Sequence, residues 1–394
     1  MLQKKTIRDA TLDNQTVFVR CDFNVPLDEN GVIQDNSRIV KSLETIKYIL
    51  KKGGKLILAS HLGRPKGKVD MKYSLKPVKA ELEKLLLMPV IMSTDVCGQD
   101  ARTKAAMLKK GEILLLENVR FEQGETKNDD YLARKFASLA DVYVNDAFGT
   151  AHRAHSSTVG ITKYLPSYAG FLIEKEIQFL KNAIEDSERP LIAILGGAKV
   201  SDKIGVILNL IDKVDTILIG GAMVFTMYKA LGIPTGKSLV EEEQLDTAKQ
   251  IFKQAVAKNV RIILPVDIVV AKEDNLDEFK TVKASQIPEN MKGVDIGCET
   301  IKNFDLEIRK AKTIIWNGPV GLFENPNFKK GTESIAQSIA DTDCISIVGG
   351  GDSASAIKML GLEDKFSHIS TGGGASLEFL EGKELPGIVA LLDK

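Results

Sequence analysis

The sequence predicts an α/β protein with two domains, each built on a parallel sheet with helices on both faces. Short apolar, β-branched runs alternate with segments of helical period, which is the order expected for a parallel sheet. This alternation occurs twice, once before residue 147 and again after residue 190. The chain of 394 residues is also long enough to form two sizeable cores.

The composition restricts the class of protein. Hydrophobic residues make up 44% and charged residues 27% of the chain, as in soluble globular proteins. The formal net charge is zero, which argues against a dedicated nucleic-acid-binding protein. The four cysteines form no CxxC pair, no apolar run is long enough to span a membrane, and the first residues lack the apolar core of a signal peptide. We therefore expect a cytoplasmic enzyme that binds neither nucleic acid nor membrane.

The elements of the first half follow from periodicity and from turn residues. Strands are expected at residues 16–21, 55–59, 90–92, 113–116 and from 142 onward, and helices at about 37–52, 76–87 and 129–140. Ser37 suits the N-cap of the first helix, and Gly53-Gly54 is a typical helix end. An apolar-periodic helix at 171–184 is expected to connect the two halves.

Six polar residues of the first half come directly after expected strands: Asp22, Asn24, His61, Arg64, Arg120 and Asn145. Ligands of open α/β sheets bind at the carboxyl ends of the strands. Eight of the eleven arginines precede residue 160, and arginine is the preferred partner of phosphate and carboxylate. These observations predict a small anionic ligand, although each arginine taken singly is better explained by a surface salt bridge.

The segment 147–169 is less regular and contains His152 and His155. A zinc site needs a third ligand and usually a partner motif, and the sequence offers neither. We expect these histidines to form hydrogen bonds or to contact an anion.

In the second half, strands are expected at 191–195, 216–219, 261–264, 313–316 and 345–348, each running into a glycine-rich or polar segment. The segment 232–238 looks like a P-loop, but three residues rather than four separate its glycines, so we expect an ordinary loop. The chain ends with a short helix at 377–380 and an apolar tail.

The stretch 191–204 carries the clearest signal for a charged ligand. A buried strand leads into Gly196-Gly197, and Lys199 and Lys203 follow where an apolar-periodic segment begins. At this spacing the two lysines are expected to share one face of a helix, near free N–H groups and the positive end of the helix dipole. They predict a site for a highly charged anion. A strand–turn–helix corner with two solvated lysines explains the stretch about equally well.

Together the two halves suggest a phosphotransferase. Glycine-rich turns and lysines suit a polyphosphate, and Asp352, inside a glycine run, suits a Mg²⁺ ion that bridges phosphate oxygens. The first half suits a small phosphorylated or carboxylated substrate. The H-R-D loop, which supplies a base in protein kinases, is absent from the sequence. An acceptor that is already an anion, such as a carboxylate, needs no base.

Several motifs, in order along the whole chain, resemble those of the phosphoglycerate kinase family. They are Arg20-Cys-Asp-Phe-Asn-Val-Pro26, His61-Leu-Gly-Arg-Pro65, Leu116-Glu-Asn-Val-Arg-Phe121, Gly196-Gly-Ala-Lys-Val-Ser-Asp-Lys203, Trp316-Asn-Gly-Pro-Val-Gly321 and Gly349-Gly-Gly-Asp352. The resemblance implies reversible phosphoryl transfer from 1,3-bisphosphoglycerate to ADP, giving 3-phosphoglycerate and ATP in glycolysis. It also implies in-line transfer with hinge closure, Mg²⁺ as the metal, and a monomer.

The resemblance implies two Rossmann-like lobes joined by a mid-chain helix. Residues 1–170 would form a 3-phosphoglycerate lobe onto which the tail 375–394 packs, 171–186 the linking helix, and 187–374 the nucleotide lobe.

Site residues follow from the same resemblance, position by position. The implied 3-phosphoglycerate site comprises Asp22, Phe23, Asn24, Arg38, His61, Leu62, Gly63, Arg64, Arg120 and Arg153. The implied nucleotide site comprises Lys203, Gly293, Asn317, Glu324, Gly350, Gly351, Asp352 and Ser353, with Asp352 meeting Mg²⁺. The implied catalytic residues are Arg38, Lys199, Lys203, Gly372 and Gly373. Arg38, Gly293 and Glu324 rest on the resemblance alone.

Two alternatives stay open at this point. A two-domain NAD-dependent dehydrogenase would need a G-x-G-x-x-G turn after a strand, and the sequence contains no such run. A non-catalytic anion-binding module would explain the arginines, but it would not explain the glycine-rich turns together with Asp352.

Overall fold

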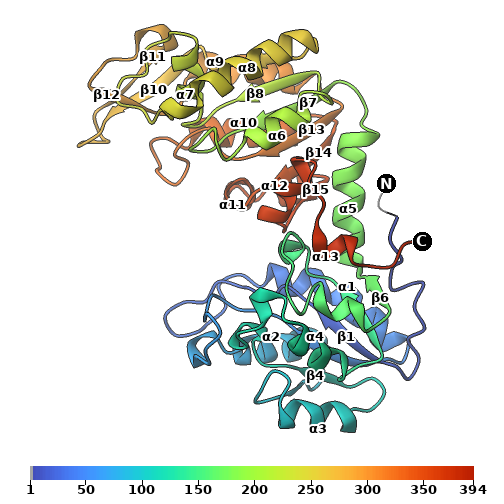
Figure 1. Ribbon diagram of the computed structural model, residues 1–394. Coiled ribbons are helices and arrows are strands. Elements are labelled where there is room, and N and C mark those ends of the chain that lie inside the picture. The colour runs from blue at the N-terminus through green and yellow to red at the C-terminus, as the bar shows by residue number, and fades with distance from the viewer. Residues whose placement is uncertain (1–2) are drawn as a thin grey trace. The chain divides into compact units, whose positions relative to one another are not determined.

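The computed structural model describes residues 3–394 and divides the chain into two compact units (Figure 1). The first unit extends to Ile177 and includes Glu384–Lys394, and the second is Gln178–Lys383. The boundary therefore falls inside the connecting helix α5 (Phe171–Glu185). The returning segment begins at Glu384, later than the expected residue 375, because α12 belongs to the second unit.

The first unit contains a six-stranded parallel sheet with the order β3-β4-β2-β1-β5-β6. Its strands are β1 (Thr16–Arg20), β2 (Lys55–Ala59), β3 (Ile91–Met92), β4 (Ile113–Leu115), β5 (Val142–Asn145) and β6 (Ser167–Ala169). Its helices are α1 (Ser37–Lys51), α2 (Lys76–Leu86), α3 (Gln99–Met107), α4 (Asp130–Ala137) and the short α13 (Pro386–Val389). Arg20 pairs with both Ala59 and Asn145, so three strands end at the same level. The residues that follow them consequently meet at one edge of the sheet.

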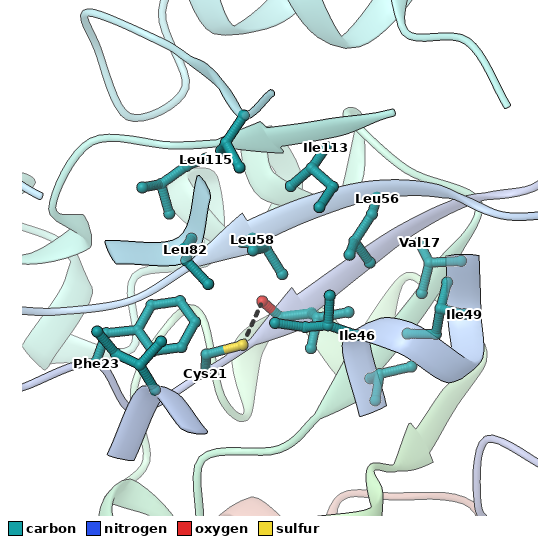
Figure 2. Packing of buried hydrophobic residues seen from close by; sticks show 14 of the residues in the cluster. Val17, Cys21, Phe23, Ile46, Ile49, Leu56, Leu58, Leu82, Ile113 and Leu115 are labelled. Atoms are coloured by element: carbon teal, nitrogen blue, oxygen red, sulfur yellow. Dashed lines mark hydrogen bonds between the residues drawn. The ribbon is translucent and has the colours of Figure 1, made fainter. Parts of the chain in front are cut away.

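The core of the first unit lies between this sheet and its helices (Figure 2). Val17 of β1, Leu56 of β2 and Ile46 of α1 are completely buried in it. Burial of each such side chain contributes about 1.5–3 kcal/mol to stability. The buried side chains at alternate positions of β1 therefore fix the register of the strand. Its last residues are consequently held at the carboxyl edge of the sheet.

The second unit contains another six-stranded parallel sheet, with the order β15-β14-β13-β7-β8-β9. Its strands are β7 (Leu191–Leu195), β8 (Thr216–Ile219), β9 (Arg261–Ile263), β13 (Thr313–Asn317), β14 (Ile345–Gly349) and β15 (His368–Ile369). Its helices are α6 (Ile204–Leu210), α7 (Val224–Ala230), α8 (Leu245–Ala257), α9 (Cys298–Ile308), α10 (Lys330–Ala340), α11 (Gly351–Met359) and α12 (Gly374–Leu380). Its core is centred on Trp316 and Phe304, which are fully buried.

An antiparallel sheet of three strands, which the sequence analysis did not predict, is added to the second unit. Its order is β11-β10-β12, with β10 (Asp267–Lys272), β11 (Phe279–Lys283) and β12 (Met291–Ile296). The residues of β11 are mostly exposed, so they lack the apolar pattern by which a buried strand is recognised. The polar segment expected after the strand at 261–264 includes Asp267, which instead begins β10.

Smaller differences concern helix ends. α1 has Asn36 as its N-cap, so Ser37 is the first helical residue and not the cap. The helix expected at residue 377, α12, begins earlier, at Gly374. Among residues 3–394, no helix combines the length and the apolar character needed to cross a bilayer.

The returning segment Glu384–Lys394 is bonded to the rest of the first unit by main-chain bonds and by the side chains of Lys4 and Asn145. The amide of Gly387 donates to the carbonyl of Ala151 (2.8 Å), and that of Leu392 donates to Ser167 (3.0 Å). Lys4 Nζ, which is almost fully buried, donates to the carbonyls of Val389 and Leu391 at 2.8 Å each. Lys4 and the returning segment are thus fixed to each other within the first unit.

Candidate active site

The carboxyl edge of the first sheet brings together Asp22, Arg38 and His61. Arg38, from α1, donates to the carboxylate of Asp22, and His61 Nδ1 lies 3.9 Å from Asp22 Oδ1. Asp22 and His61 are almost fully buried, whereas the Arg38 side chain is 34% exposed. Only the family resemblance pointed to Arg38, because this residue lies on a helix and does not directly follow a strand.

Three hydrogen bonds tie the His61–Arg64 segment to its neighbours. Asn24 Oδ1 accepts from the amide of Gly63 (2.8 Å), and Arg120 Nη1 donates to the Gly63 carbonyl (2.8 Å). Asn118, completely buried, donates from Nδ2 to the Leu62 carbonyl at 2.7 Å. The side chains of Phe23 and Leu62 belong to the apolar core, so a ligand could meet these two residues only through their main chain.

A cavity of about 540 Å³ lies beside this segment and is strongly basic. Its lining is Arg64, Lys66, Gly67, Arg120, Glu122, Gln123, Thr126, Lys127 and Arg153. Within the described part of the chain, Arg120 Nε is buried without a hydrogen-bond partner. Burial, followed by the charges of Arg20 and Arg153, lowers the pKa of Arg120 to about 10, so its charge persists at neutral pH. An oriented, unpaired donor beside exposed Arg64 and Arg153 is suited to bind a phosphate.

A buried hydrogen-bond network lies next to the carboxyl edge of the first sheet. Arg20, fully buried, donates from Nε to Ser157 Oγ (2.8 Å) and lies with Nη2 at 3.3 Å from His61 Nδ1. Ser157 in turn donates to the buried carboxylate of Glu125 (2.6 Å). The network holds His61 in one orientation. It left no local signal in the sequence, because Ser157 and Glu125 lie far from Arg20 along the chain.

Two polar residues singled out in the sequence have structural partners. Asn145 Nδ2 donates to the Gly387 carbonyl of the returning segment (2.9 Å). His152 Nε2 accepts from Arg153 Nε (3.0 Å), so this histidine orients a cavity arginine.

In the second unit, residues 196–203 form a loop that we call the lysine loop. Lys199 and Lys203 do not share a helix face as expected: residues 201–203 form a turn, Lys203 is the N-cap, and α6 begins only at Ile204. The amide of Lys203 donates to the carbonyl of Val200 (2.8 Å), which closes the turn before the helix starts. Lys199 is exposed, and Lys203 Nζ donates to Asn317 Oδ1.

Close packing of main chain explains the first glycine of the lysine loop. A Cβ on Gly196 would lie 2.0 Å from the Pro319 carbonyl oxygen, so no larger residue fits. The amides of Gly196 and Gly197 donate to Asn317 (3.0 Å) and Pro319 (3.1 Å). The loop therefore runs directly against the segment that follows β13.

The N-terminus of α11 provides free amides beside an unpaired side-chain donor. Gly350 is the N-cap with φ +92°, a conformation that favours glycine, and Asp352 lies exposed in the first turn. Asn317 Nδ2 is buried and has no partner among the described residues, and a Cβ on Gly349 would lie only 2.9 Å from it. Burial lowers the pKa of Lys203, while Asp202 and Asp352 oppose this shift, so Lys203 and Asp352 are electrostatic neighbours. Helix amides, an amide donor and a lysine together suit phosphate oxygens.

A largely apolar cavity of about 300 Å³ extends from this point. It is lined among others by Gly197, Gly221, Val224, Phe225, Leu239, Gly293, Val320, Glu324 and Asp352. Its volume and apolar walls suit a flat aromatic group. Gly293, Glu324 and Asp352, which are distant in the sequence, all line this cavity. Phe225 and Leu239 also line it, but no motif in the sequence pointed to them.

Gly372 and Gly373 lie at the start of α12, where Gly373 is the N-cap with φ +49°. The Gly372 amide donates to Ser370 Oγ (3.1 Å). The structure places this turn in the second unit with the nucleotide candidates.

One α/β unit has a basic cavity for an anion, and the other has phosphate donors beside an apolar cavity. These two sites on one chain fit the transfer of a charged group between two bound ligands. The fold and the sites thus define a two-domain phosphotransferase. Comparison with known proteins makes the assignment specific. Residues 7–383 match the family model described as phosphoglycerate kinase.

Curated relatives and solved structures agree. The chain is 54% identical to phosphoglycerate kinase of Prosthecochloris aestuarii and 56% identical to that of Dictyoglomus turgidum, with full coverage of both chains in each case. The solved phosphoglycerate kinases from Coxiella burnetii (TM-score 0.89, 40% identity) and Pyrococcus horikoshii (TM-score 0.86, 33% identity) each cover 98% of both chains. The chain belongs to the phosphoglycerate kinase family. It is a glycolytic kinase that transfers a phosphoryl group between 1,3-bisphosphoglycerate and ADP, and the comparisons give no support to a dehydrogenase.

Proposed function

We propose that the first unit binds 3-phosphoglycerate and its 1-phosphorylated form, and that the second unit binds the nucleotide. The observation that carries this division is the difference between the two cavities. One is lined by three arginines and two lysines, and the other by glycines and apolar side chains beside a helix N-terminus. A small anion fits the first cavity, and a base with a phosphate chain fits the second.

In the first unit, Arg64, Arg120 and Arg153 bind the distal phosphate, and Asp22, Asn24 and His61 hold the glycerate part. Arg38 stands beside the reacting carboxyl group. Its bond to Asp22 keeps the guanidinium in place while one side of it stays exposed. Phe23, Leu62 and Gly63 support these contacts through the main chain.

In the second unit, the base enters the cavity beside Gly293 and Glu324, and the phosphates meet Asn317, Lys203 and the amides of Gly350–Ser353. Lys199 neutralises the phosphoryl group in transit together with Arg38, near the turn at Gly372-Gly373. The acceptor is a carboxylate, so no residue has to remove a proton, and catalysis consists of positioning and charge neutralisation.

Mg²⁺ fits the donor set on the second unit. Among residues 3–394, no group of three or more metal-binding side chains occurs, but Mg²⁺ usually takes only one or two carboxylates and completes its shell with phosphate oxygens and water. Asp352, exposed beside Lys203, is the residue that would hold it. When bound, the ion would reduce the negative charge of the phosphates.

The two ligands occupy different units, so we propose that transfer requires hinge closure with both ligands bound. Reacting atoms have to come within about 3–3.5 Å with water excluded. Small-angle scattering should therefore show a smaller radius of gyration with both ligands than with either one, and an unchanged value would contradict closure. We further propose that the protein is cytoplasmic, because its four cysteines are free as in a reducing compartment, and that it is a monomer, as the family resemblance implies. Analytical ultracentrifugation tests the monomer.

Calorimetric titration of two variants tests the division of ligands. Arg64→Ala should weaken 3-phosphoglycerate at least tenfold and leave Mg-ADP within twofold, because one charge-assisted hydrogen bond contributes about 1.5–3 kcal/mol. Asn317→Ala should show the opposite pattern. Equal losses for both ligands in either variant would mean that the ligands are not divided between the units.

A further inference from the structure

We propose that Glu241 is a positioning residue for phosphoryl transfer, because its buried side chain holds the middle of the lysine loop and thereby sets the place of Lys199. The proposal rests on the function assigned above to Lys199. Glu241 lies outside all the motifs that resemble those of the phosphoglycerate kinase family. It immediately precedes a 3₁₀ turn, Glu242–Gln244, and its role became visible only through its contacts.

Both ends of the lysine loop are fixed independently of Glu241. At the first end, the amides of Gly196 and Gly197 are bonded to the segment after β13, and the Gly197 carbonyl accepts from the amide of Met223 (3.1 Å). At the other end, Lys203 is the N-cap of α6 and its Nζ donates to Asn317 Oδ1. Between these ends lie Ala198–Asp202, whose side chains are exposed except for that of Val200.

Glu241 supplies the contacts to this middle part. One carboxylate oxygen accepts from the amide of Ser201 (3.0 Å), and the other accepts from its hydroxyl (2.5 Å). The amide of Val200 also donates to the carboxylate. The amide of Glu241 itself donates to Thr226 Oγ1 in α7 (3.0 Å), so the residue connects the loop to a buried helix.

The contacts need an ionised carboxylate. Glu241 is only 8% exposed, and burial of a charge is costly unless hydrogen bonds compensate for it. Burial by itself would raise the pKa of Glu241. The bonds from Ser201 and Val200 and the charge of Lys199 outweigh this effect and lower the pKa, so the group stays charged at neutral pH.

Lys199 depends on Glu241 more than Lys203 does. Lys199 directly precedes the two residues that Glu241 binds, and it lies on the exposed part of the loop. Lys203 has its own anchor in Asn317. Loss of Glu241 should therefore displace Lys199, and a displacement of about 1 Å can cost about a hundredfold in rate.

The direction of the effect separates positioning from simple electrostatics. Glu241→Gln removes a negative charge next to a site for polyphosphate, which by charge alone would favour the nucleotide and the transition state. Positioning predicts the opposite, a lower kcat. Glu242 provides a matched control, since Glu242→Gln makes the same charge change at an exposed neighbour.

A double-mutant cycle tests the proposal on the full-length enzyme. Glu241→Gln should lower kcat at least tenfold, leave the Michaelis constant for the phosphoglycerate substrate within twofold, and have little effect on kcat in a Lys199→Ala background. Glu242→Gln should retain wild-type kcat. If Glu241→Gln does not fold, Ser201→Ala removes one of the same bonds at an exposed residue. It should lower kcat about threefold, and this loss should also vanish in the Lys199→Ala background.

The outcomes separate the present proposal from the proposed function. Equal losses of kcat from Glu241→Gln with and without Lys199 would indicate a general structural role and overturn the proposal. The same holds if Lys199→Ala is impaired while Glu241→Gln retains wild-type kcat. Wild-type kcat in Lys199→Ala would reject the function assigned to Lys199 itself, and the positioning role would fall with it.

Discussion

At the scale of single residues, His61 shows how a buried hydrogen bond selects a protonation state. Its Nδ1 faces Arg20 Nη2 at 3.3 Å, and arginine can only donate. Nδ1 must then be the acceptor, which leaves the proton of the neutral ring on Nε2. Burial, and then the charges of Arg20, Arg120 and Arg38, hold the pKa of His61 well below its ordinary value. His61 therefore offers a neutral N–H donor to the ligand proposed for this site.

We predict that His61 remains the neutral Nε2–H tautomer from about pH 5.5 to 8, because protonation would place a further positive charge among buried arginines. Long-range ¹H–¹⁵N correlation spectra would show this, with His61→Gln used to assign the signals. A His61 resonance that titrates near the ordinary histidine value of about 6.5 would contradict the prediction.

At the scale of elements, the close approach of β12 and α7 shapes the cavity proposed for the nucleotide. A Cβ placed on Gly293 would lie 1.9 Å from the ring of Phe225. This ring is buried and packs edge-on against Tyr228, with ring centroids 5.9 Å apart, so it has little room to move except into the cavity. The glycine thus preserves space for the ligand through its neighbour.

Gly293→Ala should weaken Mg-ADP about tenfold, leave 3-phosphoglycerate unchanged, and lower the free energy of unfolding by about 1–3 kcal/mol through overpacking. Calorimetry with both ligands and urea unfolding measure these effects. Phe225→Leu makes room for the added methyl group, so the double variant should regain part of the lost stability. A double variant that is no more stable than Gly293→Ala would exclude the ring as the cause.

The parallel strands could be predicted well from the sequence, whereas the candidate site could be predicted only in part. The difference has a physical cause. Buried runs such as Leu191–Leu195 carry their own signal, and a parallel sheet brings strand ends together whatever the rest of the chain does. The exposed strand β11 has no such pattern, and the turn at 201–203 depends on Glu241, some 40 positions away. Contacts between distant segments, like that of Phe225 with Gly293, cannot be predicted from local spacing.

At the scale of the whole molecule, buried titratable groups in the first unit have opposite effects on acid stability. Burial, and then Arg20 and Arg120, lower the pKa of His155 to about 3, below the unfolded value of about 6.5. The unfolded chain then binds more protons between these values, so stability is lost as the pH falls from about 6.5. Burial raises the pKa of Asp146 to about 7, so its contribution increases as the pH falls from about 7 to 4.

If His155 is replaced by a group that does not titrate, the opposite effect of Asp146 on acid stability should become measurable. We predict that His155→Gln gains about 1–2 kcal/mol of stability relative to wild type between pH 6.5 and 4.5, after allowance for residual solvent screening. Urea unfolding followed by circular dichroism at several pH values would measure this. Fluorescence of Trp316, the single tryptophan, reports the second unit and serves as the internal control. A pH-independent difference between variant and wild type would show that His155 does not titrate in this way.

The bonds between Lys4 and the returning segment also affect how the protein is made. The first unit contains the earliest and the last residues of the chain, while the whole second unit lies between them in the sequence. Domains usually fold in order of synthesis, the N-terminal one first. Until residues 384–394 have been synthesised, the first unit lacks the Leu392 amide that donates to β6 and the Val389 and Leu391 carbonyls that accept from Lys4. The second unit can therefore be complete before the first, and a nascent chain stalled before residue 384 should leave Lys4 without the carbonyls that bury it.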